Sequence, residues 1–567
     1  MSTEHPWMDS AKAPRERAEA LVAAMTLEQK IAQLHGTMET VDIYDLANSV
    51  SSAEEMEQLT EQIQVERHVD AAEELEIPRM RVTNGPVGVG MGDGYPSPKA
   101  TALPMTIGLA AGFDPQLARD YGDLIGSETA TLGQHVLEGP GVCLHRTAIS
   151  GRNFEYFSED PFLSGVIGVE VTKGIQDHDV IPMGKHFAVN DQETERFRAS
   201  VEIDEHVLRE LYLLPFEMLV KDGRIAAIMS AYNRVRGTCA TESRYLLHDI
   251  LRREWGFEGY VQSDFWSCRS TAASLSAGVD LEMPDDKFLN EERVKAALND
   301  TSLEIETVDR ALVRRFTQMF RFEQFGKEYD PGQIDAAAHG AASRRIGAQL
   351  AVLLKNDDAR LPLDPHAARS IVLIGQSEYV DEACNGGGGS SKVDPLYTVT
   401  PLDGMRDVLA DLGSDASADK VTVARDLSNL HEAVAAAGEA DHVHAPRAGL
   451  DAPRPRRAPP RRGRGRRLPH HPLLRGPGDG LPVIPGPGDP PAVPVRVRAV
   501  VHELRARRRP RVRGGDRCGA PARGLGAGHE HRLRGRRRGR AGLSGHPVGG
   551  AAAQAPGGLC EGPPGAG

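Results

Sequence analysis

The sequence lacks the cysteine pairs that would tie a structure together or hold a metal. Its six cysteines, among 567 residues, stand singly and never form a C-x-x-C pair. This spacing excludes the common zinc motifs and indicates no disulfide framework. We therefore expect free thiols and a reducing cytoplasmic setting.

Long apolar runs are also absent. No run of about 18 consecutive apolar residues occurs, so no membrane span is expected. The first ten residues, M-S-T-E-H-P-W-M-D-S, have neither the basic start nor the apolar centre of a secretory signal, and none is predicted.

Lysine is missing from the last part of the chain. Residues 1–443 hold 41 of the 67 Lys and Arg and 73 of the 80 Asp and Glu, a net charge of −32. Residues 444–567 hold the other 26 basic residues, all of them arginine, and 7 acidic ones, a net charge of +19. A change this sharp indicates two origins for the chain, not two faces of one protein.

Residues 444–567 show no apolar periodicity either. The tract P-R-P-R-R-A-P-P-R-R-G-R-G-R-R at 453–467 has no apolar face and cannot bury enough surface to offset chain entropy. One interpretation is a disordered basic tail that binds nucleic acid weakly through phosphates. The interpretation we favour is a reading-frame shift in GC-rich DNA.

Strand-like and helix-like segments alternate over the first 330 residues, which predicts a parallel sheet or barrel. Residues 26–29 read as a capping box that opens a helix, and residues 39–72 as a helical or loop excursion. Strands are expected at 79–83, 184–189, 225–231 and 260–264, and helices at 115–131, 204–221 and 243–254.

A second α/β unit begins near Ala341. A helix running through Leu354 is expected to lead to S-I-V-L-I-G at 370–375, a strand of the buried parallel kind. The glycine-rich loop at 385–391 lacks the Lys-Ser/Thr ending of a P-loop, so a flexible active-site loop is favoured over nucleotide binding.

One carboxylate stands out among these elements. The predicted strand at 260–264 ends on Asp264, and aromatic residues follow it at once. A carboxylate at the end of a buried strand is costly unless something pairs with it or uses it. In an α/β barrel that position faces the reaction. The alternative is a strand-end aspartate that caps the next helix.

Seven stretches, in order, resemble the family 3 glycoside hydrolases over roughly residues 15–440. They are M-T-L-E-Q-K-I-A-Q-L (25–34), G-R-N-F-E-Y-F-S-E-D-P-F-L-S-G (151–165), K-H-F-A-V-N-D-Q-E-T (185–194), M-S-A-Y-N-R-V-R-G (229–237), E-W-G-F-E-G-Y-V-Q-S-D-F (254–265), A-G-V-D-L-E-M-P (277–284) and G-G-G-G-S-S-K-V-D-P-L-Y-T-V-T-P-L (386–402). The resemblance implies the α/β class: a (β/α)8 TIM-type barrel at 15–330 and a truncated α/β sandwich at 341–443, with the active site between them. Residues 444–567 form the non-native tail.

The resemblance further implies a retaining β-glycosidase, most like a β-glucosidase of carbohydrate metabolism, that cleaves terminal β-linked sugars. Such enzymes use two carboxyl groups about 5–5.5 Å apart, so the resemblance implies that neither a metal nor a cofactor is needed. Asp264 matches the family's nucleophile, and Arg152, Lys185 and His186 match residues that bind the sugar. Tyr232 lies in the family's S-A-Y-N segment, so its hydroxyl is expected beside the nucleophile.

Each assignment has a plainer alternative. Arg152 could form an ion pair with Glu155 or Glu159, and His186 could be a satisfied core histidine. One departure from the family also matters: Asn84 stands where the family's Asp accepts hydrogen bonds from distal sugar hydroxyls. An amide has one acceptor oxygen and no charge, which puts sugar specificity in doubt, although Asp93 could compensate.

The second carboxyl group is missing. The family's acid/base glutamate follows a strand expected near 440–450, yet no glutamate lies between Glu439 and Glu503, and residues 441–450 look unsuited to a buried strand. The His-Asp acid of the N-acetylglucosaminidase branch is not seen either.

If the codons of the tail are read with a shift of one base, two of its segments resemble the family. With permitted codons, R-V-R-A-V-V-H-E-L-R (496–505) becomes G-Y-G-L-S-Y-T-S-F, and G-H-E-H-R-L-R (528–534) becomes V-T-S-T-G-S. Both resemble the family's fibronectin-like third domain. The alternative function is therefore an inactive sugar-binding relic or a misread frame. The expected partner is a small glycoside or oligosaccharide, without nucleic acid or membrane.

Overall fold

The computed structural model describes residues 5–38, 67–90, 99–327, 330–359, 361–376, 387–423, 429–440 and 442–444. Several sequence predictions lie outside the described residues. They are most of the excursion at 39–72, Asp93, the start of the glycine-rich loop, and the tail at 444–567 beyond its first residue.

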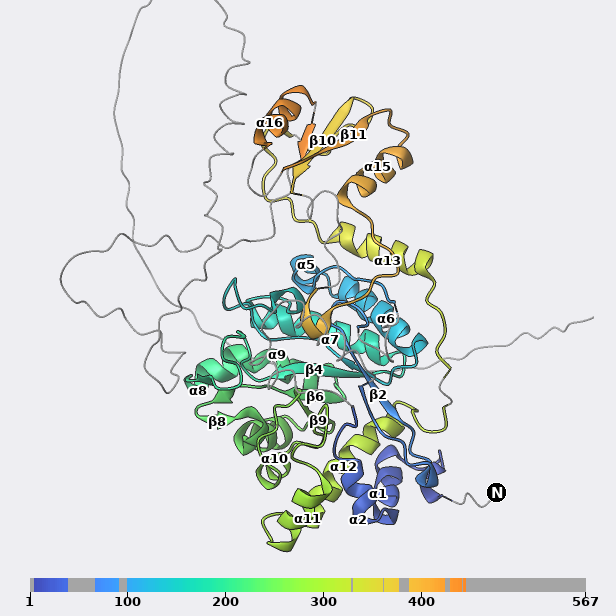
Figure 1. Ribbon diagram of the computed structural model, residues 1–567, viewed down its shortest axis with the longest axis vertical. Helices are drawn as coiled ribbons and strands as arrows, with labels where there is room; N and C mark the ends of the chain where they lie inside the picture. The colour runs from blue at the N-terminus through green and yellow to red at the C-terminus, as the bar shows by residue number, and fades with distance from the viewer. Residues whose placement is uncertain are drawn as a thin grey trace, which may run out of the picture. The chain divides into compact units, whose positions relative to one another are not determined.

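Six strands form the central sheet of the first domain (Figure 1). In sheet order they are β1 (Arg67–Val69), β2 (Met80–Asn84), β3 (Val136–Glu138), β4 (Ile181–Phe187), β6 (Ala227–Ser230) and β9 (Tyr260–Ser263). All neighbours are parallel except β1 and β2, which are antiparallel. Buried residues fill every position of β3, β4, β6 and β9, as expected for strands covered on both faces.

Two short segments close this sheet into a barrel. Gln262 of β9 bridges to Leu281, and the next residue, Glu282, bridges to His35. The amide of Thr37 then donates to His68 of β1 at 3.1 Å, which completes the circle. Among the described residues, the predicted barrel is therefore present as six strands and two bridged segments. It differs from the expected form in its antiparallel first strand and in the two positions held by single bridges.

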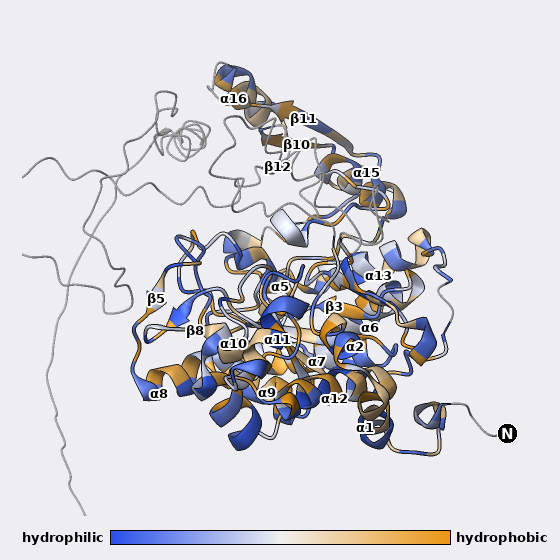
Figure 2. Cartoon of the chain, turned by 60° about the horizontal axis from the view of Figure 1, so that its bottom comes forward, coloured by the Kyte–Doolittle hydropathy of each residue, from blue (hydrophilic) through white to orange (hydrophobic). Residues whose placement is uncertain are grey.

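The longer helices around the barrel bury one face each. Along α12 the buried residues Val308, Leu312, Phe316 and Met319 recur at helical spacing, and hydrophilic stretches alternate with apolar ones along the surrounding helices (Figure 2). The main helices are α1 (Pro14–Ala24), α2 (Leu27–Ala32), α5 (Thr106–Ala111), α6 (Pro115–Thr131), α7 (Pro161–Gln176), α8 (Glu205–Val207), α9 (Leu214–Lys221), α10 (Ala272–Ala277), α11 (Glu291–Asn299) and α12 (Ile305–Arg321).

The sequence predicted the well-capped helices best. The capping box at Thr26 and Gln29 is present, and α6 has the predicted bounds, with Asp114 as its N-cap. The helix expected at 204–221 is interrupted by a π-helical turn at Leu208–Tyr212, because Pro215 cannot donate to the helical ladder and a new helix begins beside it. The helix expected at 243–254 is a π-helix, η6 (Tyr245–Glu254).

The second unit contains a three-stranded parallel sheet in the order β11 (Ser417–Thr422), β10 (Ser370–Gly375), β12 (His442–His444). Its helices are α13 (Ala336–Gln349), which precedes the sheet, α15 (Pro401–Asp411) and α16 (Leu430–Glu439). Strand β10 has the predicted bounds. A small core of Ile371, Leu373, Leu402, Leu409 and Ala418 lies against the sheet.

One prediction for this unit was wrong. The helix expected through Leu354 ends at Gln349, because the apolar run at 351–354 has no helical period, and Leu354 is 91% exposed. Residues 442–444, which lie in the stretch judged unsuited to a buried strand, pair with β10 through backbone groups. In the described part of the chain, no helix combines the length and apolarity needed to cross a bilayer.

Candidate active site

Asp264 directly follows β9 at the C-terminal end of the barrel and is 6% exposed. Its Oδ1 accepts a hydrogen bond from the amide of Phe265 at 2.8 Å. Its Oδ2 lies 3.6 Å from Nε2 of His186 and has no hydrogen bond within the described ranges. The next helix, α10, has Thr271 as its N-cap, so Asp264 does not cap it. The capping alternative was therefore wrong.

The surroundings of Asp264 act on its charge in opposite directions. Burial raises the pKa of Asp264 above its usual value, while Arg152, Arg196, the Phe265 amide and the hydroxyl of Tyr232 oppose that shift. A carboxylate with one oxygen bound and the other unbonded keeps lone pairs for reaction.

Tyr232 follows β6, the strand next to β9, and is buried. Its hydroxyl lies close enough to Asp264 to lower that group's pKa, as the sequence predicted. The guanidinium of Arg196 stacks over the Tyr232 ring at 4.2 Å from its centre. This contact holds the ring and brings a positive charge near the carboxylate.

His186 lies on β4 and is 1% exposed. Its Nδ1 is 3.0 Å from the hydroxyl of Tyr156, and its Nε2 faces Asp264. Burial and the nearby cations Arg152 and Lys185 hold the pKa of His186 well below its usual value, so the imidazole is neutral. His186 is thus a satisfied buried histidine and a neighbour of Asp264 at the same time.

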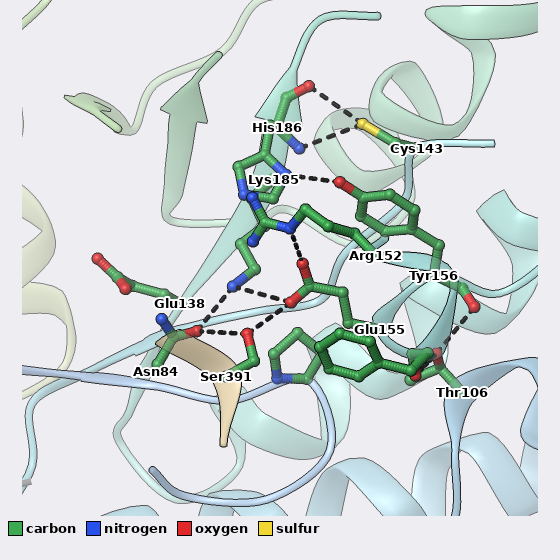
Figure 3. Close-up of polar contacts among 12 residues, drawn as sticks. Asn84, Thr106, Glu138, Cys143, Arg152, Glu155, Tyr156, Lys185, His186 and Ser391 are labelled. Atoms are coloured by element: carbon green, nitrogen blue, oxygen red, sulfur yellow. Dashed lines mark hydrogen bonds and ion pairs between the residues drawn. The ribbon is translucent and has the colours of Figure 1, made fainter. Parts of the chain in front are cut away.

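Arg152 and Lys185 share one carboxylate, Glu155 (Figure 3). Nε of Arg152 donates to Oε1 of Glu155, and Nζ of Lys185 lies 3.4 Å from Oε2. Although burial opposes the shift, the two cations and the hydroxyl of Ser391 lower the pKa of Glu155 to about 2. The ion pair proposed as an alternative for Arg152 therefore exists. It leaves the other guanidinium donors available, since the group has five N–H.

Asn84 is the last residue of β2 and is 4% exposed. Its Oδ1 accepts from Nζ of Lys185 at 2.7 Å, and Oγ of Ser391 lies 3.2 Å from the same oxygen. The following residue, Gly85, has a φ of +149°, and a Cβ there would lie 2.0 Å from the carbonyl oxygen of Gly88. Only glycine lets the chain turn back here and hold Asn84 in place.

All six predicted residues thus lie in one buried site, on the ends of β2, β4, β6 and β9 and on the short helix η3 (Asn153–Glu155) that follows Arg152. Sequence reasoning missed the roles of Tyr156 and Ser391. Both lie in stretches quoted for the family resemblance, so the signal was present. Ser391 is 1% exposed and donates to Oε2 of Glu155 at 2.6 Å, which brings the glycine-rich loop to the site.

Comparison with known families explains this arrangement. Residues 26–318 match the glycosyl hydrolase family 3 N terminal domain, and residues 351–445 match the glycosyl hydrolase family 3 C-terminal domain. The chain belongs to glycosyl hydrolase family 3. The second match ends at residue 445, beside the change in composition at 443.

The curated relatives are longer than this chain. A beta-glucosidase from Rhizobium radiobacter is 39% identical over 348 residues, which are 61% of this chain and 42% of that protein. A probable beta-glucosidase K from Aspergillus fumigatus is 36% identical over 60% of this chain and 44% of its own length. The chain therefore spans less than half of these relatives.

Solved structures of beta-glucosidases have the same fold. DesR, a beta-glucosidase from Streptomyces venezuelae in complex with D-glucose, superposes with a TM-score of 0.62 at 31% identity, covering 72% of this chain and 50% of that one. Beta-glucosidase 3B from Thermotoga neapolitana, in complex with alpha-D-glucose, gives 0.61 at 28% identity and covers 74% and 56%. The barrel and the following α/β unit are therefore a shared architecture.

Proposed function

We propose that this chain carries the nucleophile half of a retaining β-glycosidase, most similar in function to a β-glucosidase. The single observation that supports this is Asp264: a buried carboxylate at a barrel strand end whose Oδ2 has no hydrogen bond in the described residues. The glucose complexes of the related enzymes agree with a small sugar as substrate.

In this proposal Oδ2 of Asp264 attacks the anomeric carbon and forms a glycosyl-enzyme. Neutral His186 faces the carboxylate and adds no competing charge. Arg152 and Lys185 donate to sugar hydroxyls, and Asn84 contacts the far end of the ring. Tyr232 orients the nucleophile.

The acid/base half is absent from the chain. The proposed domains are a barrel at 15–330, a partial sandwich at 341–443, and an out-of-frame tail at 444–567. The position expected for the family's glutamate falls in that tail, where no glutamate precedes Glu503. Loss of general acid–base assistance commonly costs about 10²–10⁴-fold, so activity should appear first on glycosides with good leaving groups.

A second candidate function is favoured by this same absence. A chain without its acid/base could be an inactive sugar-binding relic. The two candidates differ in whether a covalent intermediate forms, because sugar binding alone transfers nothing to Asp264.

The setting proposed is cytoplasmic carbohydrate metabolism, with a small glycoside as partner and neither nucleic acid nor membrane. The described cysteines, Cys143, Cys239 and Cys268, are free and buried, which agrees with a reducing compartment.

The direct test is hydrolysis of a 2,4-dinitrophenyl β-D-glucoside by the full chain and by Asp264→Ala. We expect the variant to lose the activity entirely, because no glycosyl-enzyme can form. Asp120→Ala, which removes an exposed carboxylate on α6, is the matched control and should keep the rate. An Asp264→Ala rate equal to that of the unchanged chain would remove Asp264 from the reaction.

A further inference from the structure

Among the described residues, the cations around the proposed nucleophile are balanced only if the nucleophile itself is counted. Four cations interact electrostatically with Asp264, and they are Arg67, Arg152, Lys185 and Arg196. The carboxylates that pair with these cations are Glu138, Glu155 and Glu193. His186 faces Asp264 as a neutral ring and adds no charge. The site is therefore electrically neutral when Asp264 is ionised.

Arg196 differs from the other three cations in the group that holds it. The others lie against Glu138 and Glu155, whose side chains are buried. Arg196 instead donates from Nη1 to Oε2 of Glu193, a side chain that is 23% exposed. Nδ2 of Asn190 donates to the other oxygen of Glu193 at 3.1 Å. Arg196 is therefore fixed at the edge of the site, on the loop that follows β4.

The guanidinium of Arg196 also covers the face of Tyr232, 4.2 Å from the centre of the ring. The ring of Phe197 meets the same ring edge-on, with 4.6 Å between the two centres. Tyr232 is 4% exposed, and its hydroxyl lies close enough to Asp264 to lower the pKa of that group. A cation over a phenol ring draws electron density from the oxygen, so the hydroxyl becomes a stronger hydrogen-bond donor.

We propose that Arg196 is a positioning residue that keeps Asp264 ionised and oriented for attack, both by its own charge and through the ring of Tyr232. This inference rests on the proposed function, in which Asp264 must be an anion to attack the anomeric carbon. Without Arg196, three cations would face four carboxylates, and the buried Asp264 would take up a proton more readily. The hydroxyl of Tyr232 would also become a weaker donor.

A single-turnover measurement tests this inference, because it needs no acid/base. 2,4-Dinitrophenyl 2-deoxy-2-fluoro-β-D-glucoside has a good leaving group and leaves a long-lived glycosyl-enzyme. The burst of dinitrophenolate is followed on the full chain between pH 4 and pH 8, and its rate should fall on the acidic side as Asp264 takes up a proton. In Arg196→Met the pKa of Asp264 should rise, which moves the midpoint of that fall to higher pH by about one unit. Arg196→Lys keeps the cation and should return the midpoint toward that of the unchanged chain.

Three further variants distinguish this role from a general disturbance of the site. Glu193→Gln removes a negative charge beside Arg196, so the midpoint should move in the opposite direction, to lower pH. Arg198→Met removes an arginine whose side chain is 84% exposed and should leave the midpoint unchanged. In a Tyr232→Phe background, Arg196→Met should shift the midpoint less than it does in the unchanged chain, because the hydroxyl is gone.

The outcomes separate this inference from the proposed function. If the unchanged chain releases no dinitrophenolate, both are contradicted. If it does, and Arg196→Met has the same midpoint, this inference is overturned while the proposed function stands. Should Arg196→Met fail to fold, Glu193→Gln decides, since a midpoint that stays constant or moves to higher pH overturns the inference. Equal shifts with and without the hydroxyl of Tyr232 would overturn the role given to the ring.

Discussion

Residues 1–443 and residues 444–567 differ in charge and composition as much as two unrelated proteins do. The first region has a net charge of −32 with lysine and arginine mixed, and the second has +19 from arginine alone. The family matches cover 26–318 and 351–445 and stop where the composition changes. The site residues Asp264, Arg152 and Lys185 all belong to the first region. The end of the family match agrees with our proposal that the codons after about residue 443 are read in another frame.

This difference divides the catalytic machinery. Retaining hydrolysis needs a nucleophile and a separate acid/base. The proposed nucleophile, Asp264, lies in the barrel, whereas the sequence after β12 has no glutamate before Glu503. If the proposed function is right, the chain has the nucleophile of the reaction without its acid/base.

The largest effect is expected from restoring the frame. The gene is resequenced around codon 443. The 567-residue chain is then expressed in parallel with a version whose reading frame has been restored. The restored protein should cleave an unactivated β-linked disaccharide about 10²–10⁴-fold faster, because it regains the acid that protonates the leaving oxygen. It should also be more soluble, since the sheet edges and the 91% exposed Leu354 would be covered. Equal rates and equal solubility would contradict the frameshift account.

An intermediate effect is expected from azide. In this chain the proposed glycosyl-enzyme has no general base to activate water for its hydrolysis. Azide is a nucleophile that attacks without a general base. Adding azide should therefore raise the steady turnover of a 2,4-dinitrophenyl β-glucoside, and the glycosyl azide product should appear with the β configuration. A turnover rate that is independent of azide would mean that the first region supplies its own base.

The smallest effect tests whether residues 1–443 fold normally when residues 444–567 follow them. Burial raises the pKa of Glu282 to about 8, although the amides of Leu289 and Phe288 oppose this. The protonated carboxyl of Glu282 stabilises the fold fully when the pH is below the pKa of glutamate in the unfolded chain, about 4.3. This stabilisation is lost as the pH rises toward 8. Glu282→Gln, which mimics the neutral acid, should gain several degrees in melting temperature over the unchanged chain between pH 5 and pH 8. Melting curves that stay parallel would show that Glu282 is not buried as described.

Local patterns predicted the local features of the fold. The strand at 370–375 was predicted from its continuous apolar run, and α6 was predicted with its observed bounds, which begin directly after its N-cap, Asp114. Both features depend on only a few neighbouring residues. Asp264 was found in the same way, from one strand and the charge at its end. The π-helical turn before Pro215 and the single-bridge closure at Leu281 depend on packing against other strands, which no short pattern records.

The finer geometry of the site depended on contacts between distant residues. The amide of Asn84 is oriented by Lys185, 101 residues away, and Glu155 meets Ser391 across 236 residues. The family resemblance named Asn84 as a departure from the pattern. Only the structure shows that the side-chain oxygen of Asn84 accepts a hydrogen bond from Lys185.

The most direct test of the account is the mass of the intact chain after mixing with a 2,4-dinitrophenyl β-glucoside and rapid acid quenching. If the chain has the nucleophile without the acid/base, a burst of dinitrophenolate should accompany a mass gain of one glucosyl residue, located to the peptide that contains Asp264. Continuous release of glucose with no covalent adduct, or an adduct on any other residue, would contradict the account.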